Sequence, residues 1–216
     1  NTILDFPAKI PRYYVNGVSP AAYLGDAANA VSAGVFIAVL DSVNATPIKN
    51  PGGLSWGEEF GPTNYRGFVF KTDDIDNRAE VINFLENGVA ANQYVVFFTV
   101  QKTIDQDYLP EAWGTDTLTL PNSIYDVLES YGATQVRNLE TLGARPYGLF
   151  FQKGNPGSMV ENIGNLEDVF DLTTVIDGTW FEGSVFSPRV GPANQWETLQ
   201  WDISGFESGT DSVALN

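Results

Sequence analysis

Carboxylates, tyrosines, tryptophans and a few arginines are the residues of this chain that could do chemistry, because it contains no cysteine and no histidine. Their absence excludes cysteine and serine–histidine nucleophiles, imidazole acid–base catalysis, disulfides and the usual zinc sites. The phosphate-binding loops G-x-G-x-x-G and G-x-x-x-x-G-K-[ST] do not occur either. Acid–base work by carboxylates and recognition by aromatic rings remain possible.

Paired carboxylates are the first candidates for acid–base work. Neighbouring acids occur at 58–59 and 167–168, and Asp105 lies two residues before Asp107. A glycosidase needs two carboxyl groups about 5 to 9 Å apart across a cleft, whereas neighbours on a strand point to opposite faces. In so acidic a chain, we expect these pairs to form a solvated surface and not a catalytic site.

The acidic run at 73–77 (DDIDN) offers oxygen ligands of the kind that calcium prefers. The EF-hand pattern fails there, because Arg78 occupies the third ligand position and the required glycine is missing. Carboxylates at the start of a helix are favoured by the helix dipole without any metal. We therefore expect residues 73–77 to cap a helix, and we expect no metal and no cofactor.

Aromatic side chains outside the apolar runs are the better candidates for recognition. Trp56 lies in a Gly/Pro-rich loop at 51–66, and Tyr108 and Trp113 lie in the stretch 101–122. Exposed rings stack on sugars or anchor a protein partner, because they bury much area with few torsions to freeze. The alternative, which we favour, is that these rings anchor loops over the open ends of a sheet.

The elements that must position these side chains begin with buried strands. Continuous apolar runs rich in branched and aromatic residues are typical of strands covered on both faces. Four such stretches occur, at 35–40, 67–71, 93–100 and 146–152.

Helix signals lie between these strands. Asn77 is a candidate N-cap, and the Asn-Gly pair at 87–88 ends the helix that it starts. A second helix is expected from its N-cap Ser123, with Asp126 at the third helical position, to Gly132. Buried strands that alternate with one-faced helices predict an α/β sandwich with a central sheet and flanking helices.

Composition divides the chain into three parts. Prolines interrupt residues 1–33, which are expected to be an irregular N-terminal segment, and residues 34–155 are expected to form the α/β domain. The Gly/Asn-rich stretch 154–165 predicts a linker to the last part, residues 156–216.

The last part has the period-two pattern of short strands, at 179–186 and 196–203. About fifty residues of short strands make at most half of a β-sandwich, so an incomplete β-sandwich segment is expected. The chain begins at Asn1 without a secretion leader. We therefore expect it to be a processed piece of a longer exported protein.

The net charge of the chain limits the classes of partner that it can bind. The 216 residues include 11 basic and 27 acidic ones, and the net charge is −16. Such a charge repels phosphate backbones, so no nucleic-acid partner is expected. No stretch approaches the roughly 20 apolar residues of a membrane-spanning helix. Strong like charge also keeps a protein dispersed, which favours a secreted or surface-exposed location.

Six short motifs between residues 34 and 154 carry a family resemblance. They are GVFIAVLD (34–41), FVFKT (68–72), VINFL (81–85), YVVFFTV (94–100), LESYGA (128–133) and RPYGLFFQKG (145–154). In this order they resemble the ILEI/PANDER-like domain, the interleukin-like EMT inducer domain of secreted animal proteins. The resemblance implies an ILEI-like α/β sandwich. This chain differs in lacking the cysteines of the animal members and in its long insertion at 101–122.

Arg145 matches the arginine that opens the last of these motifs. A guanidinium offers bidentate geometry to carboxylates or sugar hydroxyls, and a related module in the stem of a mammalian glycosyltransferase binds glycans. The resemblance therefore implies that Arg145 binds a ligand. Trp56, Tyr108 and Trp113 are added to this candidate ligand-binding set because they are aromatic rings outside the apolar runs. The alternative is that Arg145 bridges to an acidic loop of its own chain.

The tail, at 187–192 and 195–201, looks like β-domains that follow such modules in very large Bacteroidetes surface proteins. Those proteins belong to the type IX secretion and gliding apparatus, and some are gingipain-like (C25) or sortase-like. The resemblance implies a location at the cell surface, outside the outer membrane. Because the chain lacks the cysteine and histidine of such peptidases and shows no recognisable catalytic constellation, we expect a non-catalytic recognition or structural module. Its expected partners are other domains of the same long chain, outer-membrane secretion or motility components, or glycans. The alternatives are a carbohydrate-binding module, a non-catalytic part of a C25-type peptidase, and an enzyme subunit that uses only carboxylates and tyrosine.

Overall fold

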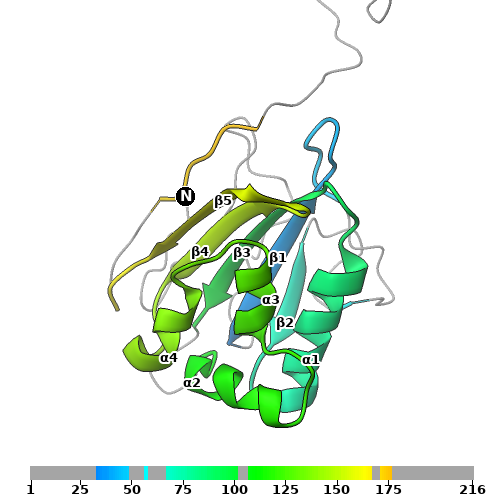
Figure 1. Ribbon diagram of the computed structural model, residues 1–216. Helices are drawn as coiled ribbons and strands as arrows, with labels where there is room; N and C mark the ends of the chain where they lie inside the picture. Colours follow the sequence, from blue (N-terminus) through cyan, green and yellow to red (C-terminus); the bar gives the residue numbers. More distant parts are fainter. Residues whose placement is uncertain (1–32, 49–55, 58–66, 102–106, 167–170, 177–216) are drawn as a thin grey trace, which may run out of the picture. The chain divides into compact units, whose positions relative to one another are not determined.

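The computed structural model describes residues 33–48, 56–57, 67–101, 107–166 and 171–176. These residues all belong to the first of two compact units of the chain, Asn1–Phe181. They form a five-stranded antiparallel sheet and four α-helices (Figure 1), which confirms the predicted mixture of strands and helices. The predicted N-terminal segment at 1–33 and the predicted tail strands at 179–186 and 196–203 lie outside the described residues.

The sheet has the strand order β2–β1–β3–β4–β5. Its strands are β1 (Gly34–Leu40), β2 (Phe68–Lys71), β3 (Tyr94–Val100), β4 (Tyr147–Gln152) and β5 (Asn155–Ile163). The four apolar stretches of the sequence are thus confirmed as β1 to β4. Strand β1 lies between β2 and β3, and all seven of its residues are buried, as a continuous apolar run predicts.

The side chains of β1 divide between the two faces of the sheet, because successive Cβ atoms point to opposite sides. Val35, Ile37 and Val39 belong to the main core cluster, which includes the helices. The even-numbered residues of β1, among them Phe36, belong to a smaller apolar cluster on the other face. There the ring of Phe36 stacks on Phe98, with the centroids 4.6 Å apart. Apolar packing therefore covers both faces of β1.

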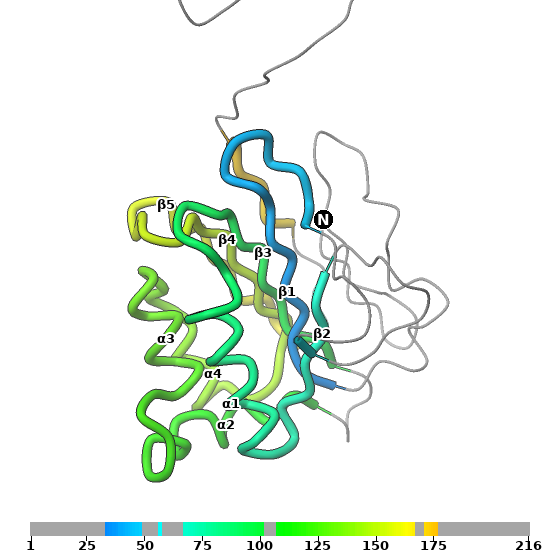
Figure 2. The backbone as a smooth tube through the Cα atoms, turned by 90° about the vertical axis from the view of Figure 1, so that its right-hand side faces the viewer, coloured from blue at the N-terminus to red at the C-terminus, as the bar shows by residue number. Residues whose placement is uncertain are grey.

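The helix layer consists of short elements. They are α1 (Ile75–Asn83) and its π-helical continuation η2 (Phe84–Gly88), α2 (Pro110–Trp113) and the 3-10 turn η3 (Gly114–Leu118), α3 (Ile124–Ser130), and the 3-10 turn η4 (Val136–Asn138) with α4 (Leu139–Leu142). The four α-helices lie on the same side of the sheet (Figure 2). In the part of the chain that the structure describes, the expected flanking helices therefore cover one face.

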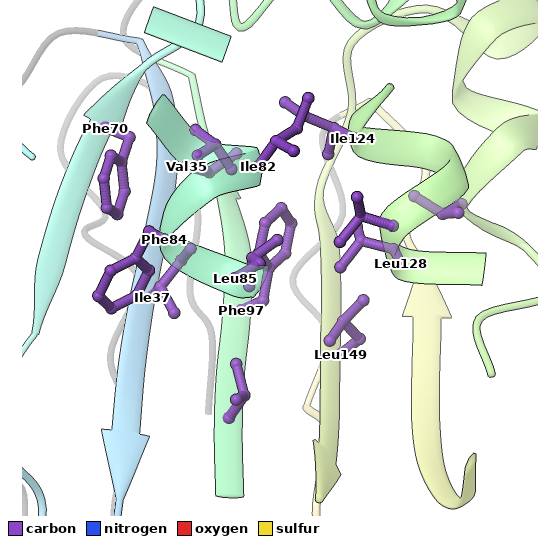
Figure 3. Packing of buried hydrophobic residues seen from close by; sticks show 14 of the residues in the cluster. Val35, Ile37, Phe70, Ile82, Phe84, Leu85, Phe97, Ile124, Leu128 and Leu149 are labelled. Atoms are coloured by element: carbon purple, nitrogen blue, oxygen red, sulfur yellow. The ribbon is translucent and has the colours of Figure 1, made fainter. Parts of the chain in front are cut away.

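Apolar side chains fix this layer to the sheet. Leu85, from the π-helical turn, lies close to Phe97 of β3, and Leu128 of α3 lies near Leu149 of β4 (Figure 3). All four side chains are buried. Truncating a buried leucine of this kind to alanine costs about 2–5 kcal/mol, so these contacts set the position of the helix layer.

Helix α1 begins earlier than predicted. Its N-cap is Asp74, whose backbone is extended and whose Oδ1 accepts a hydrogen bond from the Asn77 N–H at 2.8 Å. The prediction of Asn77 as N-cap is wrong, because Asn77 is the third helical residue and its amide donates to Asp73 and Asp74. The carboxylates of 73–77 do cap a helix, as expected.

The prediction of a linker at 154–165 is also wrong. Asn155–Ile163 forms β5, which pairs antiparallel with β4 and makes an edge of the sheet. Gly154 has a φ of +93°, a conformation that glycine adopts without strain and that closes the turn between the two strands. The glycines and asparagines of this stretch therefore mark a hairpin and its edge strand.

Candidate functional site

The structure brings three of the four predicted ligand-binding residues together at one end of the sheet. Tyr108 and Trp113 come from the insertion, and Arg145 comes from the segment just before β4. An ion pair between Arg78 and Asp116 lies beside them, and Thr72 is hydrogen-bonded both to Arg78 and to Tyr108. We call the three residues and this ion pair the insertion cluster. It lies where β2 and β3 end and β4 begins.

Tyr108 is the centre of the insertion cluster. Its hydroxyl donates to the Arg145 carbonyl at 2.7 Å and accepts from the Arg145 N–H at 2.9 Å. Its own carbonyl accepts from Trp113 Nε1 at 3.1 Å and from Thr72 Oγ1 at 2.8 Å. Tyr108 and Trp113 are each 0% exposed, so neither ring is available to a ligand in this conformation. Their position corresponds to the loop-anchoring alternative.

Arg78 and Asp116 attach the insertion to α1. Arg78 Nε donates to Asp116 Oδ2 at 2.7 Å and Nη2 donates to Oδ1 at 2.8 Å, so the pair is bidentate. The remaining nitrogen, Nη1, donates to the Thr72 carbonyl at 2.8 Å. The side chains are 8% and 2% exposed. Such a desolvated and hydrogen-bonded pair is costly to break from either side.

The aromatic part of the insertion cluster, together with Tyr125 of α3, holds neutral hydroxyls. The Trp113 ring packs between Tyr108 and Tyr125, at centroid distances of 5.5 and 5.3 Å. Tyr125 donates its hydroxyl proton to the Pro110 carbonyl at 2.7 Å. Burial raises the pKa of Tyr108 and of Tyr125 far above the ordinary tyrosine value. Both hydroxyls therefore stay protonated at neutral pH, and their protons are already donated to backbone carbonyls.

Arg145 is held by its backbone as much as by its guanidinium. Nη2 donates to the Leu142 carbonyl at 2.7 Å, while Nε is buried without a hydrogen-bond partner. Thr99 Oγ1 donates to the Arg145 carbonyl at 3.2 Å and accepts from the Tyr147 N–H at 3.0 Å. These bonds fix the entry of the chain into β4.

Trp56, the fourth predicted residue, packs elsewhere. Its ring meets Phe84 edge to face, with the centroids 5.4 Å apart, and it is only partly buried. A Cβ added to Gly88 would lie 3.1 Å from the Trp56 ring, so the indole also covers the end of the π-helical turn. Trp56 is therefore a partly buried ring on the α1 side of the core.

Sequence reasoning missed Lys153, which closes the end of α1. Its ammonium donates to the carbonyls of Leu85, Glu86 and Val89 at 2.8, 2.6 and 2.7 Å. These carbonyls lack partners within the helix, so one side chain replaces several bonds at once. Desolvation lowers the pKa of Lys153. The signal that could have identified Lys153 is its position in the Lys-Gly pair that closes the last motif.

Sequence reasoning also missed Glu161, because it lies in the stretch predicted as a linker. Its Oε1 accepts from the Thr134 N–H, from Thr134 Oγ1 at 2.8 Å and from the Gln135 N–H at 2.9 Å. Its Oε2 accepts from the Tyr147 hydroxyl at 2.8 Å. One carboxylate thus joins β5 to the turn before α4 and to β4.

The described cations are similarly engaged. Besides Arg78, Arg145 and Lys153, Arg137 donates to Asp126 and to both carboxylate oxygens of Glu129. Within the described ranges, no group of three side chains gathers that could hold a metal ion. No helix in the same ranges is long and apolar enough to cross a membrane.

The polar groups of the insertion cluster are arranged to hold backbone in place. The hydroxyls of Tyr108 and Tyr125 each donate to a backbone carbonyl. The guanidinium of Arg78 donates to the carboxylate of Asp116 and to the Thr72 carbonyl. Such a network makes a region rigid, but it presents no base or nucleophile that is free to react. Comparison with protein-family models, curated proteins and solved structures finds no match to this chain.

Proposed function

We propose that this chain is a non-catalytic recognition or structural module of a large secreted or cell-surface bacterial protein, associated with the type IX secretion or gliding apparatus. One observation carries the proposal. The residues best suited to chemistry, Tyr108, Trp113, Arg78 and Asp116, are buried and bonded to their own chain. What remains for partners is a carboxylate-rich surface on a rigid scaffold.

The proposal includes the family. The six motifs of the ILEI/PANDER-like resemblance fall on β1, β2, the end of α1, β3, α3 and β4, in that order. Two features support a structural meaning for them: Lys153 of the closing motif binds three carbonyls, and Gly132 of the fifth has a φ of +110°, as a helix-ending glycine requires. In this proposal, the described sheet and helices are an ILEI-like domain.

The experiment has an activity arm and a partner arm. The full chain is assayed against glycosides and peptides beside its Tyr108→Phe variant, and we expect no turnover from either. Turnover by the wild-type chain that the variant loses would contradict the proposal. In the partner arm, the chain is used as bait on solubilised outer membranes, and we expect a stoichiometric complex. A chain recovered alone would contradict an architectural role.

A second function, carbohydrate binding, has two observations in its favour. Arg145 Nε is a buried donor without a partner, and Trp56 is partly exposed. A glycan array with the wild-type chain, Trp56→Ala and Arg145→Lys separates this function from the first. Binding that either variant loses supports it, and no binding across the array removes it. A non-catalytic role inside a C25-type peptidase predicts the same outcome as the first proposal.

A further inference from the structure

Within the described part of the chain, strand β5 is an unpaired edge of the sheet. It ends the strand order, and its ladder partner is β4 alone (Figure 1). The opposite edge differs, because Gly57 lies so close to β2 that a Cβ added to it would sit 2.4 Å from the Val69 carbonyl. Among the described residues, β5 is therefore the longer and more open edge, with nine residues that are all exposed or partly exposed.

The outward groups of β5 follow from its register. The Gly164 N–H donates to the Pro146 carbonyl at 2.8 Å, and Val160 pairs with Phe150. In an antiparallel strand, the backbone groups of successive residues point alternately to the two sides. From Val160 to Gly164 the even-numbered residues therefore face β4, and Met159, Glu161 and Ile163 turn their N–H and carbonyl groups outward; the register shifts before Val160, where Asn155 pairs with Gln152. No described residue bonds to these outward groups.

The same edge presents no free charge. Glu161 is the only charged residue of β5, and its carboxylate already accepts bonds from Thr134, Gln135 and Tyr147. Met159 and Ile163 pack against the main core but stay partly exposed. On a chain of net charge −16, this edge is a surface that another strand can approach without meeting an unpaired carboxylate.

We propose that β5 pairs with β5 of a second copy of this chain, antiparallel about a two-fold axis. An unpaired edge is a template for another strand, and a two-fold axis makes the same edge complementary to itself. With the axis at Val160, Met159 faces Glu161 of the second copy, so the two Glu161 residues are not directly opposite. A copy explains a neutral edge better than a cationic partner does, since a cationic partner would be drawn to carboxylates. The inference does not depend on the proposed function.

The absence of cysteine makes a cross-linking test clean. Val160 faces its own copy as a non-hydrogen-bonded pair, whose Cα separation of about 4.5 Å suits a disulfide. We expect Val160→Cys to form a covalent dimer on mild oxidation, whereas Leu118→Cys, at a side chain that is 87% exposed on η3, stays monomeric. Equal cross-linking of the two variants would overturn the proposal.

Association of the unmodified full chain is measured by sedimentation equilibrium. Two copies of charge −16 repel each other, and salt screens this repulsion, so we expect the dimer fraction to rise with salt. Binding to a cationic partner would instead weaken as salt is added. Amide exchange should slow on dimerisation at Met159, Glu161 and Ile163, and stay unchanged at Val160 and Asn162. A chain that remains monomeric at high salt overturns the proposal. Outward amides already protected in the monomer also overturn it, because another segment of the same chain then covers the edge.

Discussion

Arg78 and Asp116 are the residues whose loss we expect to cost most, because each would leave the other charged and buried. Arg78→Met removes the bidentate partner of Asp116 and the bond to the Thr72 carbonyl. Removing one member of a buried pair typically costs about 3–5 kcal/mol. We therefore expect the free energy of unfolding, measured by urea denaturation, to fall by about that amount.

The matched control is the double variant Arg78→Met/Asp116→Leu, which replaces the pair with apolar side chains of similar size. Such replacements are often neutral or stabilising, so the double variant should recover most of the loss. A double variant as unstable as the single one would show that the loss comes from the bond to the Thr72 carbonyl and not from the ion pair.

Lys153 gives a second prediction at the residue scale. Lys153→Met keeps the length of the side chain and removes three hydrogen bonds to carbonyls at the end of α1. A hydrogen bond with a charged partner contributes about 1.5–3 kcal/mol, and we expect a loss in that range because desolvation of the ammonium offsets part of the three bonds. Amide exchange should speed up at Val89, whose N–H closes the π-helical turn on Phe84. Unchanged exchange there would contradict the capping role.

Individual residues show why sequence reasoning stopped short of the site. The sequence places Tyr108 and Trp113 in a loop, but whether a loop ring anchors or binds depends on what surrounds it, and that is set by the fold. The bond between Arg78 and Asp116 joins residues 38 positions apart, and no local pattern marks it. Glu161 had no visible role until β4 and the turn at 134–135 came beside it.

Helix α3 is the element that the sequence specifies most completely. Ser123 Oγ accepts from the Asp126 N–H, and the Asp126 carboxylate accepts from the Ser123 N–H, which makes a reciprocal capping box. Ser123→Ala should cost about 1 kcal/mol of stability, as the loss of an N-cap usually does. Ser123→Asp, which can still cap, is the control and should keep most of the stability in thermal unfolding.

The same capping box makes a prediction about acid. Burial by itself would raise the pKa of Asp126, but hydrogen bonds from Ser123 and Arg137 outweigh it and lower the pKa below the ordinary 3.8. A lowered pKa stabilises the folded state above the unfolded value, and the gain is lost as pH falls through the folded pKa. The stability difference between wild type and Asp126→Asn should therefore shrink below about pH 4. A difference that persists at pH 2 would contradict it.

The other elements show where local signals mislead. Aspartate and asparagine are both good N-cap residues, so the sequence allows a helix to begin after Asp74 or after Asn77. The helix begins after Asp74 because the backbone of Asp74 is extended, which the sequence does not predict. Strand β5 has a composition typical of turns, and its pairing with β4 overrides that preference. Local patterns thus predict buried strands and capped helices well, but not an edge strand that depends on its neighbour.

At the scale of the whole described fold, the sequence predicts the classes of element but not their arrangement. Apolar runs identify β1 to β4, because a strand that is buried on both faces has a continuous apolar sequence. The order β2–β1–β3–β4–β5 and the gathering of the α-helices on one face depend on contacts between distant segments. Those contacts place three buried tyrosines, Tyr108, Tyr125 and Tyr147, around the helix layer.

These three tyrosines predict how the fold responds to alkali. Burial raises the pKa of each far above the ordinary value of 10, and the Glu161 carboxylate raises that of Tyr147 further. The unfolded chain releases these protons near pH 10, whereas the folded chain retains them, so the contribution of the three tyrosines to stability is constant below about pH 10 and stability falls above it. Absorbance at 295 nm should therefore rise in two phases. A tyrosine that is not buried titrates first, with the circular dichroism unchanged, and the buried three follow together with unfolding. Tyr147→Phe should make the fall of stability with pH less steep, and a single phase near pH 10 with the fold intact would contradict the burial of all three.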